Sequence, residues 1–158
     1  MNYLSIEIPI CDCSLWYRLS ACWNLLDAQA SILRRKKSDR RLCNEIVLEG
    51  PDRGVAKEGA IPPGPISYAR SLPRAKALQR EVLIAYQMNG RDLSQDHGYP
   101  VRAIVPGHYA MASVKWLTRI CAVREPFQGY WQTSDYGYWD YVDGQPVRRA
   151  LGEMKLKS

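Results

Sequence analysis

Short runs in which apolar and polar residues alternate recur along this chain, and this pattern predicts β-strands. The first run lies in residues 1–13, and Pro9 places it at the edge of a sheet. The Asn89-Gly90 pair is typical of a hairpin turn. Further strands are predicted at residues 45–48, 82–86 and 101–105, and one more within residues 114–125.

Between these runs the apolar spacing changes to a helical period. Residues 14–33 predict an amphipathic helix, with Ser14 as its N-cap. A helical turn is predicted after Ser71, and the Gly-Pro-Asp segment at 50–52 predicts a turn that ends the strand before it. The prolines at 62–65 predict an extended loop. Strands and helix together predict a mixed α+β domain.

Length and composition fit one globular domain. The chain has 158 residues, of which 46% are hydrophobic and 24% charged. No apolar stretch reaches the roughly 18 residues of a membrane helix, and no basic segment precedes an apolar run at the N-terminus. The sequence therefore predicts no membrane partner, and it leaves the compartment open. Five scattered cysteines without a CxxC pair favour reduced thiols.

Positive charge is concentrated in the stretch RRKKSDRR, residues 34–41, and the whole chain has a net charge of +6. Such a cluster suits a solvated helix end, where cations complement the helix dipole. A phosphate patch for nucleic acid is the alternative, but no aromatic residue lies within the cluster to stack on bases. The favoured interpretation predicts no nucleic-acid partner.

A second set of cations flanks the strand predicted at 101–105. Arg102 and Lys115 lie at its two ends, and His97 precedes it in DHGYPVR. If the strand is buried, its ends converge on neighbouring loops, so both cations could face one anionic ligand. Taken singly, each residue also has an ordinary structural explanation, such as a surface histidine or an arginine that extends to solvent.

The surrounding stretch AYQMNGRDLSQDHGYPVRAIVPGHYAMASVKWLTRI resembles the core signature of the sulfite oxidase family of molybdopterin-binding oxidoreductases. LEGPDRG and PISYARSLPRAKAL precede it and WQTSDYGY follows it, in the order of that family, so the resemblance covers residues 44 to about 138. It implies a mixed-sheet domain that binds molybdenum through the dithiolene of a phosphorylated pterin.

The resemblance also implies roles for individual residues. Tyr136 would lie near the metal and act there by hydrogen bonding, not as a nucleophile. His108 and Tyr109 are expected to be structural. The residues implied to bind the cofactor are Asp52, His97, Arg102, Ser113, Val114 and Lys115.

In two places the chain departs from the family pattern. The family's metal-ligating cysteine has no counterpart here, because Cys11 and Cys13 lie too close to Trp16, and we expect the ligand loop to fall before Met1. The ending LGEMKLKS resembles the segment that precedes the family's dimerisation domain. We therefore expect a domain truncated at both ends. Its parts are a divergent segment at 1–43, the molybdopterin-binding domain at 44–145 and the start of a linker at 146–158.

By resemblance, the function is oxygen-atom transfer to a small substrate such as sulfite, with electrons passed to an acceptor such as a haem protein. A homodimer is expected only for the full-length family enzyme. The chain alone is expected to be inactive, because it lacks the thiolate ligand and the substrate arginines. The alternative is an inert remnant or a basic binding module on the family scaffold.

Overall fold

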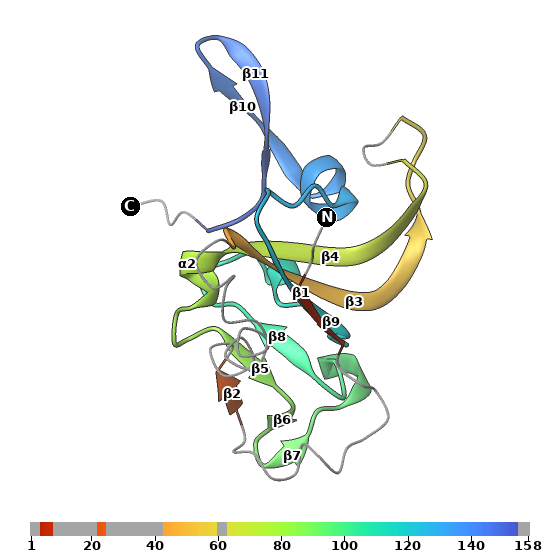
Figure 1. Ribbon diagram of the computed structural model, residues 1–158, viewed down its shortest axis with the longest axis vertical. Helices are drawn as coiled ribbons and strands as arrows, with labels where there is room; N and C mark the ends of the chain where they lie inside the picture. Colours follow the sequence, from red (N-terminus) through yellow and green to blue (C-terminus); the bar gives the residue numbers. More distant parts are fainter. Residues whose placement is uncertain (1–3, 8–21, 25–42, 60–62, 155–158) are drawn as a thin grey trace.

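The computed structural model describes residues 4–7, 22–24, 43–59 and 63–154. Two antiparallel sheets form its body (Figure 1). The larger sheet has the order β1-β9-β3-β4 and comprises Leu4–Glu7, Arg119–Val123, Glu45–Val55 and Pro65–Pro73. The smaller sheet has the order β2-β5-β8 and comprises Cys22–Asn24, Leu83–Ala85 and Arg102–Ile104.

The main core lies between these two sheets. In β3, Ile46 and Leu48 point into it, while Val47 between them faces the opposite side of the sheet. Such alternation follows from the two-residue period of a strand. The smaller sheet contributes Ile84 and Ala103, which are 2% and 0% exposed. Val47 instead packs with Ala69, Cys121 and Val123 in a second cluster, with Phe127 against it.

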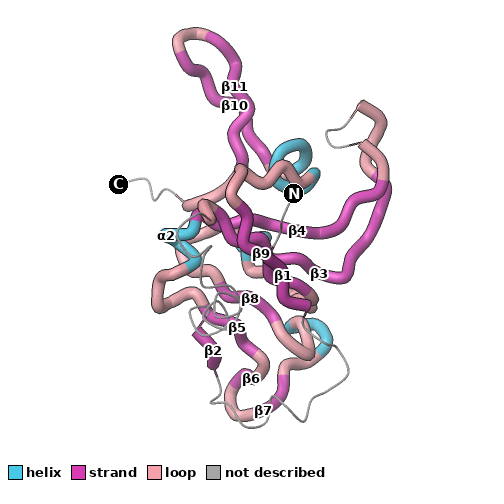
Figure 2. Tube along the Cα trace, viewed as in Figure 1, coloured by secondary structure: helices cyan, strands magenta, loops and turns pink. Residues whose placement is uncertain are grey.

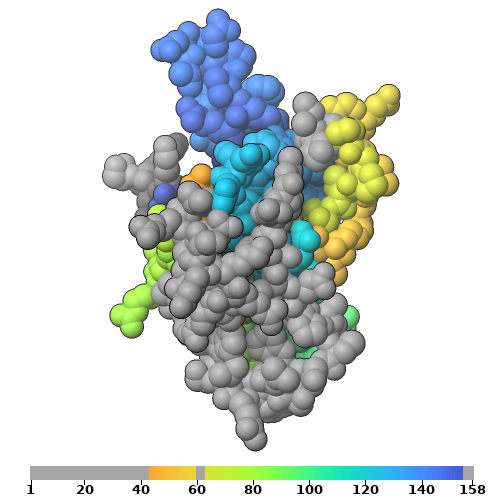
Figure 3. Space-filling model, in the orientation of Figure 1, coloured from red at the N-terminus to blue at the C-terminus, as the bar shows by residue number. Residues whose placement is uncertain are grey.

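Short elements connect the strands (Figure 2). A single helical turn, α2, follows β4, and a hairpin of β6 and β7 follows β5. A second hairpin, β10–β11, stands clear of the body in Figures 1 and 3. The bounds are α2 Arg74–Ala77, β6 Gln87–Met88, β7 Arg91–Asp92, η2 Gln95–His97, η3 Ala110–Ala112, η4 Trp131–Asp135, β10 Gly137–Val142 and β11 Gln145–Ala150.

Several predicted elements are confirmed. The strands predicted at 82–86 and 101–105 correspond to β5 and β8, and α2 supplies the helical turn after Ser71. Asn89 and Gly90 have φ values of 55° and 75°, as a tight hairpin turn requires. Of the edge strand predicted in residues 1–13, the described part is β1, at the edge of the larger sheet.

Other predictions are wrong. Cys22–Asn24, inside the predicted amphipathic helix, forms β2 and pairs with β5, so sheet pairing overrides the local helical spacing. The remainder of that helix lies outside the described residues, as does the basic cluster at 34–41. The Gly-Pro-Asp segment does not end β3, which continues to Val55. The predicted strand within 114–125 begins only at Arg119, because Trp116 has a φ of 49°.

The mixed α+β prediction holds only in part. Every ladder among the described strands is antiparallel, whereas a mixed sheet also needs parallel pairs. The described helices are single turns, too short to act as crossover connections between parallel strands. Within the described residues, no helix has the length and apolar character to cross a membrane. The predicted domain boundaries stay predictions, although residues 145–150 belong to the second hairpin.

Candidate functional site

The loop that leads from η3 to β9 forms one wall of a cavity of about 310 Å³. Five of the seven predicted site residues line this cavity, namely Asp52, Ser113, Val114, Lys115 and Tyr136. The other lining residues are Tyr68, Ala110, Met111 and Trp116. Residues from four separate parts of the chain therefore meet at one place.

A bulge in β3 brings Asp52 to the cavity. Glu49 pairs with Ala69 and Arg53 pairs with Ser67, so three residues of β3 stand opposite Tyr68 alone. A bulge bends the strand and releases the extra residues from the ladder. Asp52 lies in this released segment and is exposed.

The bulge also packs directly against the loop. A Cβ atom at Gly50 would lie 3.2 Å from the carbonyl oxygen of Lys115 and 3.4 Å from Val114 Cγ1. The backbone N–H and the Oγ1 hydroxyl of Thr118 both donate to the Glu49 carbonyl, at 2.8 and 3.0 Å. The end of the loop is thus attached to the start of the bulge.

On its other side the loop packs against the η2 segment. Lys115 Nζ donates to the Asp96 carbonyl at 2.7 Å. Gly98 has a φ of 98°, and a Cβ atom there would lie 3.0 Å from Lys115 Cβ and 3.1 Å from its Cα. A side chain at position 98 would therefore be both strained and in collision with the loop.

Arg102 and His97 lie behind the loop instead of lining the cavity. Arg102 Nη1 donates to the His97 carbonyl at 3.2 Å and Nη2 to the Ser113 carbonyl at 3.4 Å. Burial lowers the pKa of the Arg102 guanidinium from its usual value. The His97 ring shares a 2.6 Å hydrogen bond with Ser94 Oγ. These contacts place the last two predicted residues one layer outside the cavity wall.

The loop backbone offers free donors to this cavity region. Among the hydrogen bonds of the described residues, none uses the backbone N–H groups of Val114, Lys115 or Trp116. Their neighbours are occupied, since Ser113 N–H donates to Ala110 and Leu117 N–H to Val101. A run of free N–H groups that includes a left-handed residue, here Trp116, is typical of a backbone anion site.

Two tyrosines, Tyr68 and Tyr136, also line the cavity, and Trp131 packs against both of them. The Tyr68 hydroxyl donates to the Met111 carbonyl at 2.8 Å, and the Trp131 ring lies between the rings of Tyr68 and Tyr136, 5.8 Å from each. Burial, together with the nearby Tyr136 and Asp52, raises the pKa of the Tyr68 phenol, while Arg70 acts in the opposite direction. Tyr68 is therefore neutral and acts as a hydrogen-bond donor.

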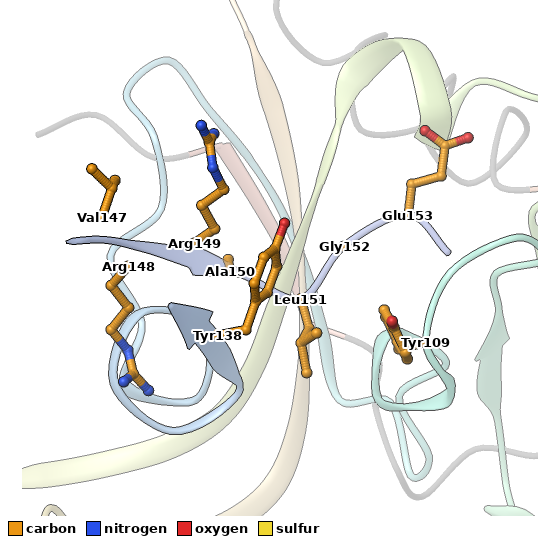
Figure 4. Close-up of a pocket in the computed structure, with 9 residues that line it drawn as sticks. All are labelled: Tyr109, Tyr138, Val147, Arg148, Arg149, Ala150, Leu151, Gly152 and Glu153. Carbon is orange, nitrogen blue, oxygen red and sulfur yellow. The ribbon is translucent and has the colours of Figure 1, made fainter. Parts of the chain in front are cut away.

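A second and larger cavity, of about 780 Å³, lies beside the β10–β11 hairpin (Figure 4). Its two arginines, Arg148 and Arg149, point in opposite directions in the figure. Arg149 is also paired with Asp140 at 2.5 Å, and Arg148 donates to carbonyls of η4. Because these polar groups do not converge, the smaller cavity is the better candidate for a binding site.

Cys43 and Cys121 do not line either cavity. Cys121 is 2% exposed in the second cluster, and burial raises the pKa of its thiol. Cys43 packs at the border of the main core. Both behave as small apolar residues, and the described residues contain no cluster of His, Cys, Asp or Glu suited to a metal ion.

Sequence reasoning missed Tyr68, Arg70, Trp116 and Trp131. The first two lie in PISYARSLP, which was not predicted as a strand although it forms β4. Its alternation of Ile66, Tyr68, Arg70 and Leu72 was the available signal. An arginine in such a row suggests solvent exposure, whereas Arg70 is 3% exposed.

Comparisons with known proteins relate this chain to one family of oxidoreductases. The family model described as "Oxidoreductase molybdopterin binding domain" matches residues 28–131. Mitochondrial sulfite oxidase of Rattus norvegicus is 45% identical over 75% of this chain, and that of Drosophila melanogaster 43% identical over 68%. These matches cover only 24% and 21% of the two relatives. The chain thus spans about a quarter of their length.

Two further matches are proteins with other names than sulfite oxidase. A nitrate reductase [NADH] of Cucurbita maxima is 34% identical over 77% of this chain, which corresponds to 12% of that protein. The structure of the sulfane dehydrogenase SoxCD from Paracoccus pantotrophus aligns with a TM-score of 0.59 and 25% identity, over 80% of this chain and 28% of the other. By fold and by sequence, this chain belongs to the family of oxidoreductase molybdopterin-binding domains.

Proposed function

We propose that the cavity beside the Ser113–Trp116 loop holds the pterin part of the molybdenum cofactor in an oxidoreductase that acts on sulfite or a similar small substrate. One observation carries the proposal. Five residues that the resemblance implies line one cavity, and Arg102 behind its wall donates both to the Ser113 carbonyl of the wall and to the His97 carbonyl. They come from segments more than 80 residues apart in the sequence.

The donor set fits a polar, anionic group. The free N–H groups of Val114, Lys115 and Trp116 would donate to phosphate or pterin oxygens. Asp52 would accept from amino or ring N–H groups, and the Lys115 ammonium adds positive charge. Arg102 would act on the backbone, because its contacts with Ser113 and His97 fix the position of the loop.

The bound cofactor would supply the two-electron redox chemistry of oxygen-atom transfer. Tyr136, which lines the cavity, would donate a hydrogen bond to the reacting group without becoming a nucleophile. The electrons would pass to an acceptor such as a haem protein. Sulfite is proposed because the matched relatives are named sulfite oxidases.

A second candidate function is a binding scaffold without redox activity. It is supported by Cys43 and Cys121, since neither of these two cysteines lines the cavity. Molybdenum analysis of the full chain, purified from cells that make the cofactor, separates the two candidates. Stoichiometric molybdenum with pterin supports the oxidoreductase domain, and pterin without metal supports the scaffold.

Titration of molybdopterin tests the site itself, at about 0.15 M salt, where surface charges are screened over roughly 8 to 10 Å. We expect Arg102→Met and Lys115→Met each to weaken binding roughly ten- to a hundredfold, since hydrogen bonds to charged groups contribute about 1.5–3 kcal/mol. Arg149→Met, which removes an exposed arginine of the hairpin, is the matched control and should have little effect.

The basic cluster supplies the competing explanation. Neutralising Arg34, Arg35, Lys36 and Lys37 together should change the affinity far less than either single variant does, and mostly at low salt. If this quadruple variant loses more affinity than Arg102→Met, the cluster is the anion site and the assignment to the cavity fails.

A further inference from the structure

Arg70 is the one buried charged residue among the described residues, with 3% of its surface exposed. It lies on β4, two residues after Tyr68. Within the described part of the chain it forms no ion pair, and its Nε–H has no hydrogen-bond partner. A cation in this position loses its hydration without gaining a carboxylate, so an ordinary role in stability does not account for it.

The contacts of Arg70 converge on two backbone carbonyls. Nη1 donates to the Trp131 carbonyl at 2.5 Å, and Nη2 donates to the Leu151 carbonyl at 2.6 Å. Trp131 begins η4, whereas Leu151 follows β11 and lies between the hairpin and Glu153 in Figure 4. The planar guanidinium can reach both carbonyls because its N–H groups form a rigid fork.

The same two residues hold the backbone of Tyr136. The Tyr136 N–H donates to the Trp131 carbonyl at 3.3 Å, and the Leu151 N–H donates to the Tyr136 carbonyl at 3.1 Å. The guanidinium carbon of Arg70 also lies 5.9 Å from the centre of the Tyr136 ring. The Arg70 side chain therefore contacts Trp131 and Leu151, the two residues that hydrogen-bond to the Tyr136 backbone, and it also lies near the Tyr136 ring.

We infer that Arg70 is a positioning residue for Tyr136, which fixes the tyrosine at the cavity through the carbonyls of Trp131 and Leu151. Arg70 does not itself line the cavity. Its functional consequence rests on the proposed role of Tyr136 next to the cofactor, whereas its structural effect can be measured without any cofactor.

The structure offers a matched control in Arg148. Its Nε donates to the Thr133 carbonyl of the same η4 at 3.0 Å, and its guanidinium lies 5.7 Å from the Trp139 ring. Arg148→Met therefore removes similar bonds from the same helix, but none to Trp131 or Leu151. Arg70→Met removes the fork, and Arg70→Lys keeps the charge without a group that can bridge both carbonyls.

Amide hydrogen exchange in the full chain without cofactor is the first measurement. In Arg70→Met we expect the amides of Tyr136 and Leu151 to exchange at least roughly tenfold faster, and the Tyr136 ring signals to shift, while amides of β3 and β9 change by less than about twofold. Arg70→Lys should give an intermediate result, and Arg148→Met should leave Tyr136 and Leu151 unchanged.

Two outcomes of this measurement overturn the inference. One is a folded Arg70→Met protein whose Tyr136 and Leu151 amides and Tyr136 ring signals match the wild type. The other is uniform acceleration of all amides, or failure of both Arg70 variants to fold, since either would assign Arg70 to general stability.

A cofactor-loaded enzyme that contains this domain and turns over substrate supplies the second measurement. Arg70→Met should lower kcat with little change in KM, and the effect should not add to that of Tyr136→Phe, because both variants remove one function. A loss of cofactor affinity as large as that of Arg102→Met would make Arg70 a binding residue and overturn the inference. If wild-type protein binds no cofactor, the proposed function fails while the exchange data still test Arg70.

Discussion

The cavity loop and the β10–β11 hairpin use similar residues in opposite environments. Both carry tryptophan, valine and cations on short segments. In the loop, Val114 is 1% exposed, and the neighbouring Gly50 and Gly98 are buried against it. In the hairpin, Trp139 and Tyr141 are 62% and 72% exposed, and every residue of β11 is exposed.

The difference shows where specificity for a ligand can reside. The loop is fixed from two sides, by the β3 bulge and by the η2 segment, so its free N–H groups have defined positions. Of the arginines in the hairpin, Arg148 donates instead to backbone carbonyls of η4, and Arg149 is paired with Asp140. Composition alone does not separate the two regions, whereas packing does.

The largest expected effect compares the core behind the loop with the hairpin surface. Leu48→Ala should lower the free energy of unfolding by about 2–5 kcal/mol, because Leu48 is fully buried and the change leaves a cavity. Tyr141→Ala should change it by no more than about 0.5 kcal/mol. Denaturant unfolding of both variants measures this. A hairpin variant as unstable as the core variant would show that the hairpin packs against the body.

A glycine pair sharpens the comparison. Gly98 and Gly144 both have positive φ, at 98° and 77°, but of the two only Gly98 has neighbours within 4 Å of the place that a Cβ atom would occupy. Gly144→Ala should therefore cost about 1 kcal/mol for backbone strain alone, and Gly98→Ala should cost more because Lys115 must move. Gly98→Ala should also weaken molybdopterin binding, whereas Gly144→Ala should leave the affinity unchanged.

The measurement is thermal unfolding of both glycine variants, together with the molybdopterin titration. Equal destabilisation would mean that the contact between Gly98 and Lys115 relaxes at no cost. The loop would then be less firmly fixed than its packing indicates.

The smallest expected effect concerns His108, at the junction of the two regions. The backbones of His108 and Glu153 form an isolated antiparallel β-bridge there. Burial and the nearby Lys76 lower the pKa of the imidazole, and Glu153 opposes this. The unfolded chain then binds the proton more readily, so the stabilising contribution of neutral His108 is complete above about pH 6.5 and is lost as pH falls below it.

Unfolding of the wild type and of His108→Gln near pH 7.5 and pH 5 checks this sign. The wild type should lose slightly more stability at the lower pH than the variant does. A variant that loses more stability than the wild type would show that protonated His108 is favoured in the folded protein.

The sequence predicted the elements whose signals are local. Asn89-Gly90 has a turn chemistry of its own, and the run at 101–105 is apolar enough to identify β8. β2 could not be predicted, because Cys22–Asn24 is a strand only through its pairing with β5. β3 passes Gly-Pro-Asp because β4 continues to pair with it after the bulge, at Arg53 and Ser67.

For the candidate site, the family resemblance supplied the residues and the structure supplied their grouping. Spacing along the chain cannot tell that Asp52 and Tyr136 line the same cavity while Arg102 lies behind its wall. Arg70 was missed for a physical reason: a buried arginine bonded to two carbonyls has the same sequence signature as one in solvent.

The β3 bulge has a consequence for changes in chain length. Three residues, 50–52, stand opposite the single residue Tyr68, so the strand carries two more residues than its partner. Side chains along a strand alternate between the two faces of the sheet. A surplus of two residues therefore leaves each paired side chain of β3, before and after the bulge, on the same face as its partner in β4. Insertion or deletion of one residue would invert residues 53–55, whereas a change of two would preserve their orientation. Length variation at this edge of the cavity is therefore restricted to even steps.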